Sequence, residues 1–191
     1  MQGTEISGRA GEIIAALGNK SLVLVGLMGA GKTTIGKRLA ARLGIKFVDA
    51  DTEIEKAAGS SIADIFKEFG EKHFREGERR VIARLLEEGP QVLATGGGAF
   101  MDEDTRAAIA TKGLSIWLKA DLDILMKRVM RRTHRPLLLT KDPEAVMRGL
   151  IDTRYPTYAQ AKLTIISHEG PHDAVVDDIE KALLDELALR R

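Results

Sequence analysis

Short apolar runs and amphipathic segments alternate along the chain and predict the order of its secondary structure. Runs of four or five residues rich in apolar side chains predict strands at residues 22–25, 46–49, 91–95, 114–118 and 163–166. Apolar residues at helical spacing predict helices at residues 33–43, 61–69, 71–88, 102–111, 121–131, 144–159 and 171–189. Strands of this length that alternate with helices indicate an α/β fold, with a parallel sheet covered by helices on both faces.

The length of the chain, 191 residues, suits one domain with a sizeable core. Ile13, Ile14 and Leu17 predict a short amphipathic helix that ends near Gly18, before the first strand. We interpret residues 1–20 as an N-terminal extension that is peripheral to the chemistry. Residues 21–191 are expected to form a single domain.

The composition of the chain limits the kinds of molecule with which the protein is expected to interact. The formal net charge is +1, from 29 basic and 28 acidic residues, which does not favour a nucleic-acid partner. The chain has no cysteine, which excludes disulfides and thiolate chemistry. No apolar run approaches the length of a membrane span, and the first residues lack the pattern of a signal peptide. We therefore expect a cytoplasmic protein with small-molecule partners and no membrane association. Nothing demands an oligomer, so a monomer is expected.

A glycine-rich loop follows the first predicted strand. Residues 26–34 read Gly-Leu-Met-Gly-Ala-Gly-Lys-Thr-Thr, which matches the phosphate-binding pattern G-x-x-x-x-G-K-[ST] between a strand and a helix. Glycines let the backbone N–H groups turn toward phosphate oxygens, and the helix N-terminus adds partial positive charge. Lys32 can reach the β- and γ-phosphates, and the Thr33 hydroxyl can bind Mg²⁺. The candidate ATP-binding residues here are Gly29, Ala30, Gly31, Lys32, Thr33 and Thr34.

Two carboxylates lie at the end of the second predicted strand. Asp49 and Asp51 are one residue apart, so in an extended segment they point the same way. One could hold Mg²⁺ or its water shell, and the other could accept a proton from an attacking hydroxyl. The alternative is that Asp51 only caps a helix that begins at Thr52.

Three further groups of residues can bind a small anion. Arg75 and Glu78 share a helix face, where Glu78 could hold the guanidinium against a substrate carboxylate or simply form a surface ion pair. Gly96-Gly97-Gly98 ends a strand, which favours close approach of the backbone to a ligand over a plain turn. Arg154 lies near a helix end and is a weak signal by itself.

A basic, proline-containing segment at residues 131–139 separates two predicted helices. It could be a mobile lid that brings Arg135 to the transferring phosphoryl group. The alternative is a solvated basic loop.

Taken in order, these motifs resemble those of shikimate kinases between about residues 20 and 165. The motifs that carry the resemblance are the glycine loop, Asp49-x-Asp51, Phe74-Arg75-x-x-Glu78, Gly96-Gly97-Gly98, Arg135-Pro136-Leu137-Leu138 and Arg154-Tyr155. The resemblance implies a three-layer P-loop kinase fold with a five-stranded parallel sheet in the order 2-3-1-4-5. It also implies substrate-binding helices at about residues 52–88 and a short lid at about residues 130–141.

The resemblance further implies transfer of the ATP γ-phosphate to the 3-hydroxyl of shikimate, a step of chorismate and aromatic amino acid biosynthesis, with Mg²⁺ as cofactor. Thr33 and Asp49 are then the metal partners, and Asp51 contacts the shikimate hydroxyls and is the candidate base. Lys32 and Arg135 neutralise developing charge. The residues implied to bind shikimate are Asp51, Arg75, Glu78, Gly96, Gly97, Gly98 and Arg154. Arg132 and Arg135 complete the ATP site, with Arg132 stacked on adenine.

The sequence departs from the family pattern in two places. The lid is short, and Glu169 stands where a basic residue is expected, so no role in binding the base is carried over to residues 168–172. Gluconate kinase is the closest alternative, against which the set of Arg75, Gly97 and Arg154 favours shikimate. A GTPase needs Asn-Lys-x-Asp, and the only asparagine, Asn19, is not in that motif.

Overall fold

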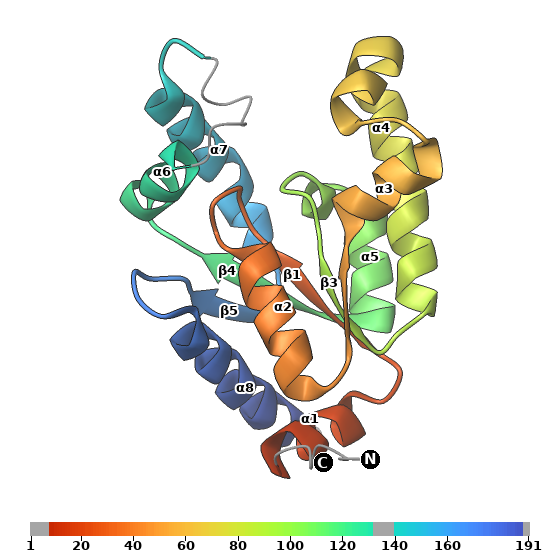
Figure 1. Cartoon of the computed structure of the whole chain (residues 1–191), viewed down its shortest axis with the longest axis vertical. Coiled ribbons are helices and arrows are strands. Elements are labelled where there is room, and N and C mark those ends of the chain that lie inside the picture. Colours follow the sequence, from red (N-terminus) through yellow and green to blue (C-terminus); the bar gives the residue numbers. More distant parts are fainter. Residues whose placement is uncertain (1–7, 132–139, 189–191) are drawn as a thin grey trace.

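A five-stranded parallel sheet forms the centre of the computed structural model, which describes residues 8–131 and 140–188 (Figure 1). Its strands are β1 (Ser21–Val25), β2 (Lys46–Asp49), β3 (Gln91–Ala94), β4 (Gly113–Lys119) and β5 (Leu163–Ile166). They are ordered β2-β3-β1-β4-β5, and Val23 of β1 pairs with Leu93 on one side and Ser115 on the other. The strand order and the parallel sheet predicted from the sequence are confirmed.

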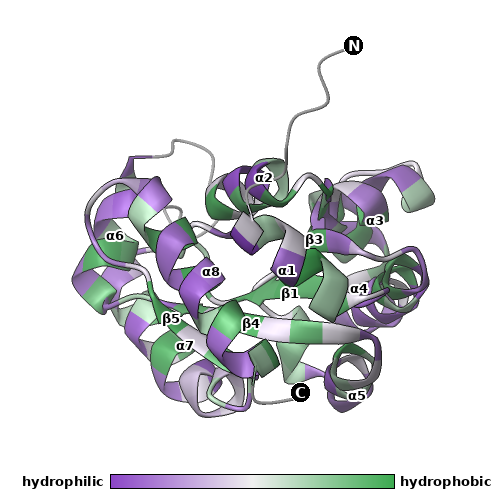
Figure 2. Ribbon diagram, turned by 90° about the horizontal axis from the view of Figure 1, so that it is seen from below, coloured by the Kyte–Doolittle hydropathy of each residue, from purple (hydrophilic) through white to green (hydrophobic). Residues whose placement is uncertain are grey.

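Helices surround this sheet and cover both of its faces. The helical elements of the described residues are α1 (Gly8–Leu17), α2 (Lys32–Leu43), α3 (Ala50–Ala58), α4 (Ile62–Glu87), the 3₁₀ turn η1 (Ala99–Met101), α5 (Glu103–Lys112), α6 (Leu122–Met130), α7 (Pro143–Tyr158) and α8 (His172–Ala188). Figure 2 shows α1, α2 and α8 on one face of the sheet, with α5 and α7 on the other. Within the described residues, no helix is long and apolar enough to cross a membrane.

The burial of each element follows its place in the fold. All five residues of the central strand β1 are buried because helices cover both of its faces, whereas edge strand β2 is only partly buried. In α2, Ile35, Leu39 and Leu43 recur every fourth residue and form the stripe that packs against the sheet. The predicted N-terminal helix is present as α1, and its buried Ile13 and Leu17 belong to the main core.

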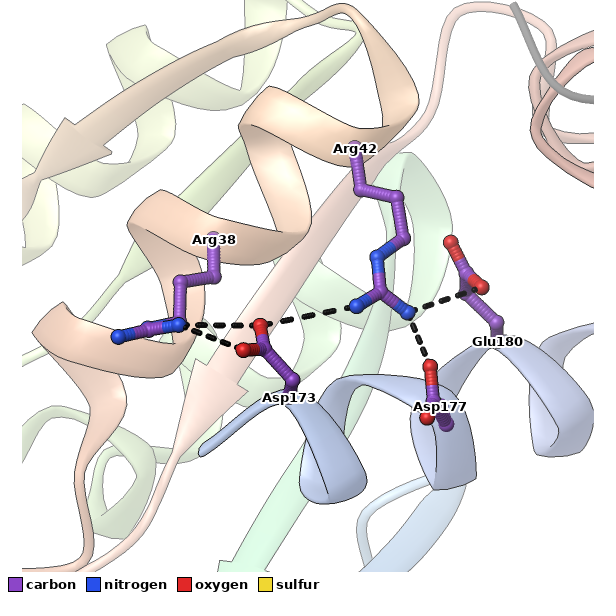
Figure 3. Close-up of polar contacts among 5 residues, drawn as sticks. All are labelled: Arg38, Arg42, Asp173, Asp177 and Glu180. Atoms are coloured by element: carbon purple, nitrogen blue, oxygen red, sulfur yellow. Dashed lines mark hydrogen bonds and ion pairs between the residues drawn. The ribbon is translucent and has the colours of Figure 1, made fainter. Parts of the chain in front are cut away.

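Helix α8 is fastened to α2 by a group of ion pairs (Figure 3). Arg38 Nη1 contacts both carboxylate oxygens of Asp173 at 3.0 and 2.9 Å. Arg42 contacts Asp173 at 3.6 Å, Glu180 at 3.5 Å and Asp177. Because α2 begins at the glycine loop, these contacts help to fix the helix that carries the loop.

Two local features of the helices bear on the sequence interpretation: the start of α3 and the break within α4. Helix α3 begins at Ala50, and its cap is Asp49, whose Oδ1 accepts hydrogen bonds from the backbone of Asp51 and Thr52. The alternative in which Asp51 is the cap is therefore wrong, since Asp51 lies inside the first turn. The two helices predicted at residues 61–69 and 71–88 are confirmed as the two parts of α4, which meet at a kink where Gly70 has a non-helical backbone (φ 79°, ψ 175°).

Candidate active site

A cavity of about 640 Å³ lies at the carboxyl ends of β1, β2 and β3, where the sequence places its candidate residues. Its walls contain Gly29, Gly31, Lys32, Thr33, Thr34, Asp49, Asp51, Arg75, Glu78, Gly96, Gly97, Gly98 and Arg154. A parallel sheet brings these segments together because loops that follow neighbouring strands emerge at the same edge. One cavity therefore joins the glycine loop to the predicted acceptor residues.

The glycine loop owes its shape to backbone conformations that side chains disfavour. Gly26, Gly29 and Gly31 have φ values of 142°, 84° and 97°. Lys32 is the first residue of α2, and its Nζ donates to the carbonyls of Gly26 at 2.6 Å and Leu27 at 3.1 Å. Ala30, also predicted to bind ATP, is not in the cavity wall: its side chain is buried, and its N–H donates to Leu27 O at 3.1 Å.

The two residues predicted to serve a metal ion are in direct contact. Thr33 Oγ1 donates to Asp49 Oδ2 at 3.1 Å, while the other oxygen of Asp49 caps α3. A hydroxyl and a carboxylate therefore stand side by side at the start of α2. Both present hard oxygen atoms, the ligand type that Mg²⁺ prefers.

Asp51 lies beside this pair in an unfavourable electrostatic environment for a carboxylate. Burial raises the pKa of the Asp51 carboxyl, and the nearby charge of Asp49 raises it further, while Lys32 acts in the opposite direction. A carboxylate with a raised pKa is a better proton acceptor than an ordinary aspartate. Asp51 thus combines access to the cavity with the basicity that a general base needs.

Arg75 is held by a buried carboxylate. Its Nη1 donates to Glu78 Oε2 at 2.6 Å, and the Glu78 side chain is only 3% exposed. The surface ion-pair interpretation of these residues is therefore wrong, since Glu78 is enclosed. Burial raises the pKa of Glu78, and Arg75 opposes that rise. This fixed arginine in the cavity wall suits a ligand carboxylate.

The three glycines pass close to the charged residues. A Cβ at Gly96 would lie 2.9 Å from Asp51 Oδ1 and 3.1 Å from Glu78 Oε1, and one at Gly98 would overlap the Arg75 guanidinium. A Cβ at Gly97 would lie 3.2 Å from Arg154 Nη1. The segment therefore lets the backbone approach four charged groups, which a plain turn does not require.

Sequence reasoning assigned no binding role to several residues that line the cavity near the glycine loop. Arg128 of α6 donates to the carbonyls of Gly29 and Ala30, to Ser167 Oγ and to the carbonyl of His168. Lys127, Arg131, Glu169, Gly170 and His172 also line the cavity. Only the segment before α8 had a positional signal, because it directly follows the end of β5. The predicted ATP-binding residues Arg132 and Arg135, and most of the predicted lid, lie outside the described residues.

Comparison with known proteins assigns the chain to a family. The sequence model described as shikimate kinase matches residues 28–184. A shikimate kinase of Bradyrhizobium diazoefficiens is 60% identical over 172 residues, which cover 90% of this chain and 83% of that protein. The chain belongs to the shikimate kinase family.

Solved structures agree with this assignment. A shikimate kinase from Acinetobacter baumannii, in complex with shikimate, superposes with a TM-score of 0.84 at 36% identity, covering 91% of this chain and 98% of that one. A gluconokinase from Sinorhizobium meliloti has a TM-score of 0.59 at 16% identity, over 89% of this chain and 94% of that one. That likeness shows the P-loop kinase fold alone. Shikimate kinases are thus the relatives that share both sequence and structure with this chain.

Proposed function

We propose that this chain transfers the γ-phosphoryl group of ATP to the 3-hydroxyl of shikimate, and that the single cavity holds both substrates. The supporting observation is the joining of a phosphate-binding loop to an acceptor subsite made of Asp51, Arg75 and Arg154. Shikimate carries a carboxylate at one end and hydroxyls at the other. The two arginines match the carboxylate, and Asp51 matches the hydroxyls.

The donor side would hold ATP as its Mg²⁺ complex. Mg²⁺ in kinases is held by one or two protein oxygens together with phosphate oxygens and water. The Thr33 hydroxyl beside the Asp49 carboxylate fits that donor set, with Thr33 as the ligand and Asp49 as the partner of its water shell. When bound, the ion supplies neutralisation of the charge that develops on the phosphoryl oxygens.

In the reaction, the 3-oxygen of shikimate attacks the γ-phosphorus and the bond to the bridging oxygen of ADP breaks. The hydroxyl proton passes to Asp51, whose raised pKa suits that role. Lys32 and the backbone N–H groups of the glycine loop stabilise the transferring group. We assign the same task to Arg135. Because phosphoryl transfer needs little covalent chemistry, positioning and charge stabilisation supply most of the rate enhancement.

The carboxylate clamp is tested by replacing Arg75. We expect Arg75→Ala to raise the KM for shikimate by roughly 10- to 100-fold, the range for losing a charged hydrogen bond, while the KM for ATP changes by less than about twofold. The matched control is Arg79→Ala, one turn further along α4, because Arg79 pairs with exposed Asp104. Equal effects of Arg75→Ala on both KM values would contradict the clamp.

A further inference from the structure

A cluster of aromatic side chains lies beneath the glycine segment. Tyr158, in the last turn of α7, is 0% exposed, and its ring packs near Trp117, Tyr155 and Phe100 at centroid distances of 5.9, 6.3 and 6.4 Å. Tyr158 is not part of the cavity wall. Any effect on substrate would therefore act through the residues that it holds.

The hydroxyl of Tyr158 meets two parts of the proposed acceptor subsite. It donates a hydrogen bond to the carbonyl oxygen of Gly97, 61 residues away in sequence. Arg154 lies one helical turn earlier on the same face of α7, and its positive charge acts on the Tyr158 hydroxyl. A Cβ at Gly97 would lie 3.8 Å from the Tyr158 hydroxyl and 3.2 Å from Arg154 Nη1, so the three groups meet at one point.

The Tyr158 hydroxyl can serve both groups. Burial raises the pKa of Tyr158 to about 12, so the hydroxyl stays protonated and donates to Gly97. A hydroxyl that donates one hydrogen bond keeps an acceptor site, which the neighbouring Arg154 guanidinium can use. Gly97 has glycine on either side, so no neighbouring side chain anchors this backbone, which is intrinsically free to rotate. An arginine on a helix also samples several rotamers unless a partner selects one. Tyr158 restrains Gly97 through its hydrogen bond and offers the Arg154 guanidinium an acceptor.

We propose that Tyr158 is a positioning residue, which sets the Gly97 peptide and the Arg154 guanidinium in the geometry that receives the carboxylate end of the acceptor. The inference rests on the acceptor subsite proposed above. According to this inference, part of the affinity for shikimate depends on the buried Tyr158 side chain, which does not contact ATP.

Tyr158→Phe tests this role because it removes one oxygen atom and keeps the ring in the core. We expect the KM for shikimate to rise roughly 3- to 15-fold, the range for a lost neutral hydrogen bond, and the KM for ATP to stay within about twofold. Tyr155→Phe is the matched control. It lies on the same helix and in the same aromatic cluster, but its hydroxyl donates to the Ala120 carbonyl. We expect it to leave both KM values unchanged.

Arg154→Ala and the double variant Arg154→Ala/Tyr158→Phe complete the cycle. If Tyr158 acts through Arg154, the double variant should raise the KM for shikimate by less than the product of the two single effects. A shikimate KM that rises in Arg154→Ala but not in Tyr158→Phe would overturn the positioning role and leave the acceptor subsite intact. An unchanged shikimate KM in Arg154→Ala would instead overturn the subsite, and the inference with it. Equal changes in Tyr158→Phe and Tyr155→Phe would indicate packing alone and would also overturn it.

Discussion

Asp51, the proposed base, is held in an environment that lowers the stability of the fold. Its carboxylate is partly buried and lies close to the charge of Asp49, and both effects disfavour ionisation. The folded chain therefore binds the Asp51 proton more tightly than the unfolded chain does. The resulting penalty is present when pH exceeds the raised pKa, and it disappears below the ordinary carboxyl pKa, where Asp51 is protonated in both states.

Asp51→Asn should therefore stabilise the protein while it removes the proposed base. We expect kcat to fall by roughly 10²- to 10⁴-fold. At neutral pH, we expect the melting temperature to rise by about 2–4 °C, which corresponds to ~1 kcal/mol in a chain of this size. The rise should shrink as pH falls toward the ordinary carboxyl range. Calorimetry across pH and steady-state rates check both parts, and an unstable variant or one with near-normal kcat would contradict them.

Gly98 is a second residue at which one added carbon atom is expected to change the binding of shikimate. Its φ of −93° and ψ of −13° suit any residue, so an added Cβ meets no backbone strain and acts only through its contact with the Arg75 guanidinium. We expect Gly98→Ala to raise the KM for shikimate about tenfold or more by displacing Arg75.

Gly77→Ala is the control for that substitution. It lies in α4, and its new Cβ would meet no atom within 4 Å. We expect an unchanged KM and a higher melting temperature, since alanine favours helix over glycine by up to about 1 kcal/mol. An unchanged KM for shikimate in Gly98→Ala would show that shikimate binding does not depend on the present position of the Arg75 side chain.

At the scale of elements, the contact between α2 and α8 joins the helix of the glycine loop to the C-terminal helix. Its two arginines have different surroundings: Arg42 meets Glu180, whose side chain is only 10% exposed, whereas Arg38 pairs with exposed Asp173. Removing one partner of an enclosed ion pair leaves the other charge unpaired, while exposed pairs contribute little.

We therefore expect Arg42→Ala to lower the free energy of unfolding by about 1–2 kcal/mol and Arg38→Ala by less than about 0.5 kcal/mol. Denaturant titration of the two variants measures the difference. Added salt should reduce the small effect of Arg38→Ala more than that of Arg42→Ala, because exposed charges are screened more strongly. Equal losses in both variants would contradict the distinction.

Element order could be predicted from the sequence because each strand and most helices carry their own periodicity, as in the stripe of Ile35, Leu39 and Leu43. The start of α3 could not be settled in this way. Asp49 and Asp51 both have capping side chains, and the choice depends on where β2 ends. The kink at Gly70 was visible in the sequence only as a break between two helical patterns.

At the scale of the whole molecule, the sheet edge explains which site residues could be predicted. Asp49 ends β2, and Asp51 and the three glycines follow closely after a strand, so parallel topology alone brings them to one cavity. Arg128 and Tyr158 could not be found in that way. They act through partners such as Ser167 and Gly97, 39 and 61 residues away, and a single sequence contains no signal for such contacts.

The identity of the acceptor is the central claim, and a coupled assay of ADP release tests it most directly. The protein would be supplied with Mg²⁺ and ATP, and with shikimate, gluconate or a nucleoside monophosphate in turn. The geometry of Asp51, Arg75 and Arg154 predicts saturable, stoichiometric ADP release with shikimate and only the background rate with the other two. Turnover with gluconate or a nucleoside monophosphate that equals or exceeds turnover with shikimate would contradict it.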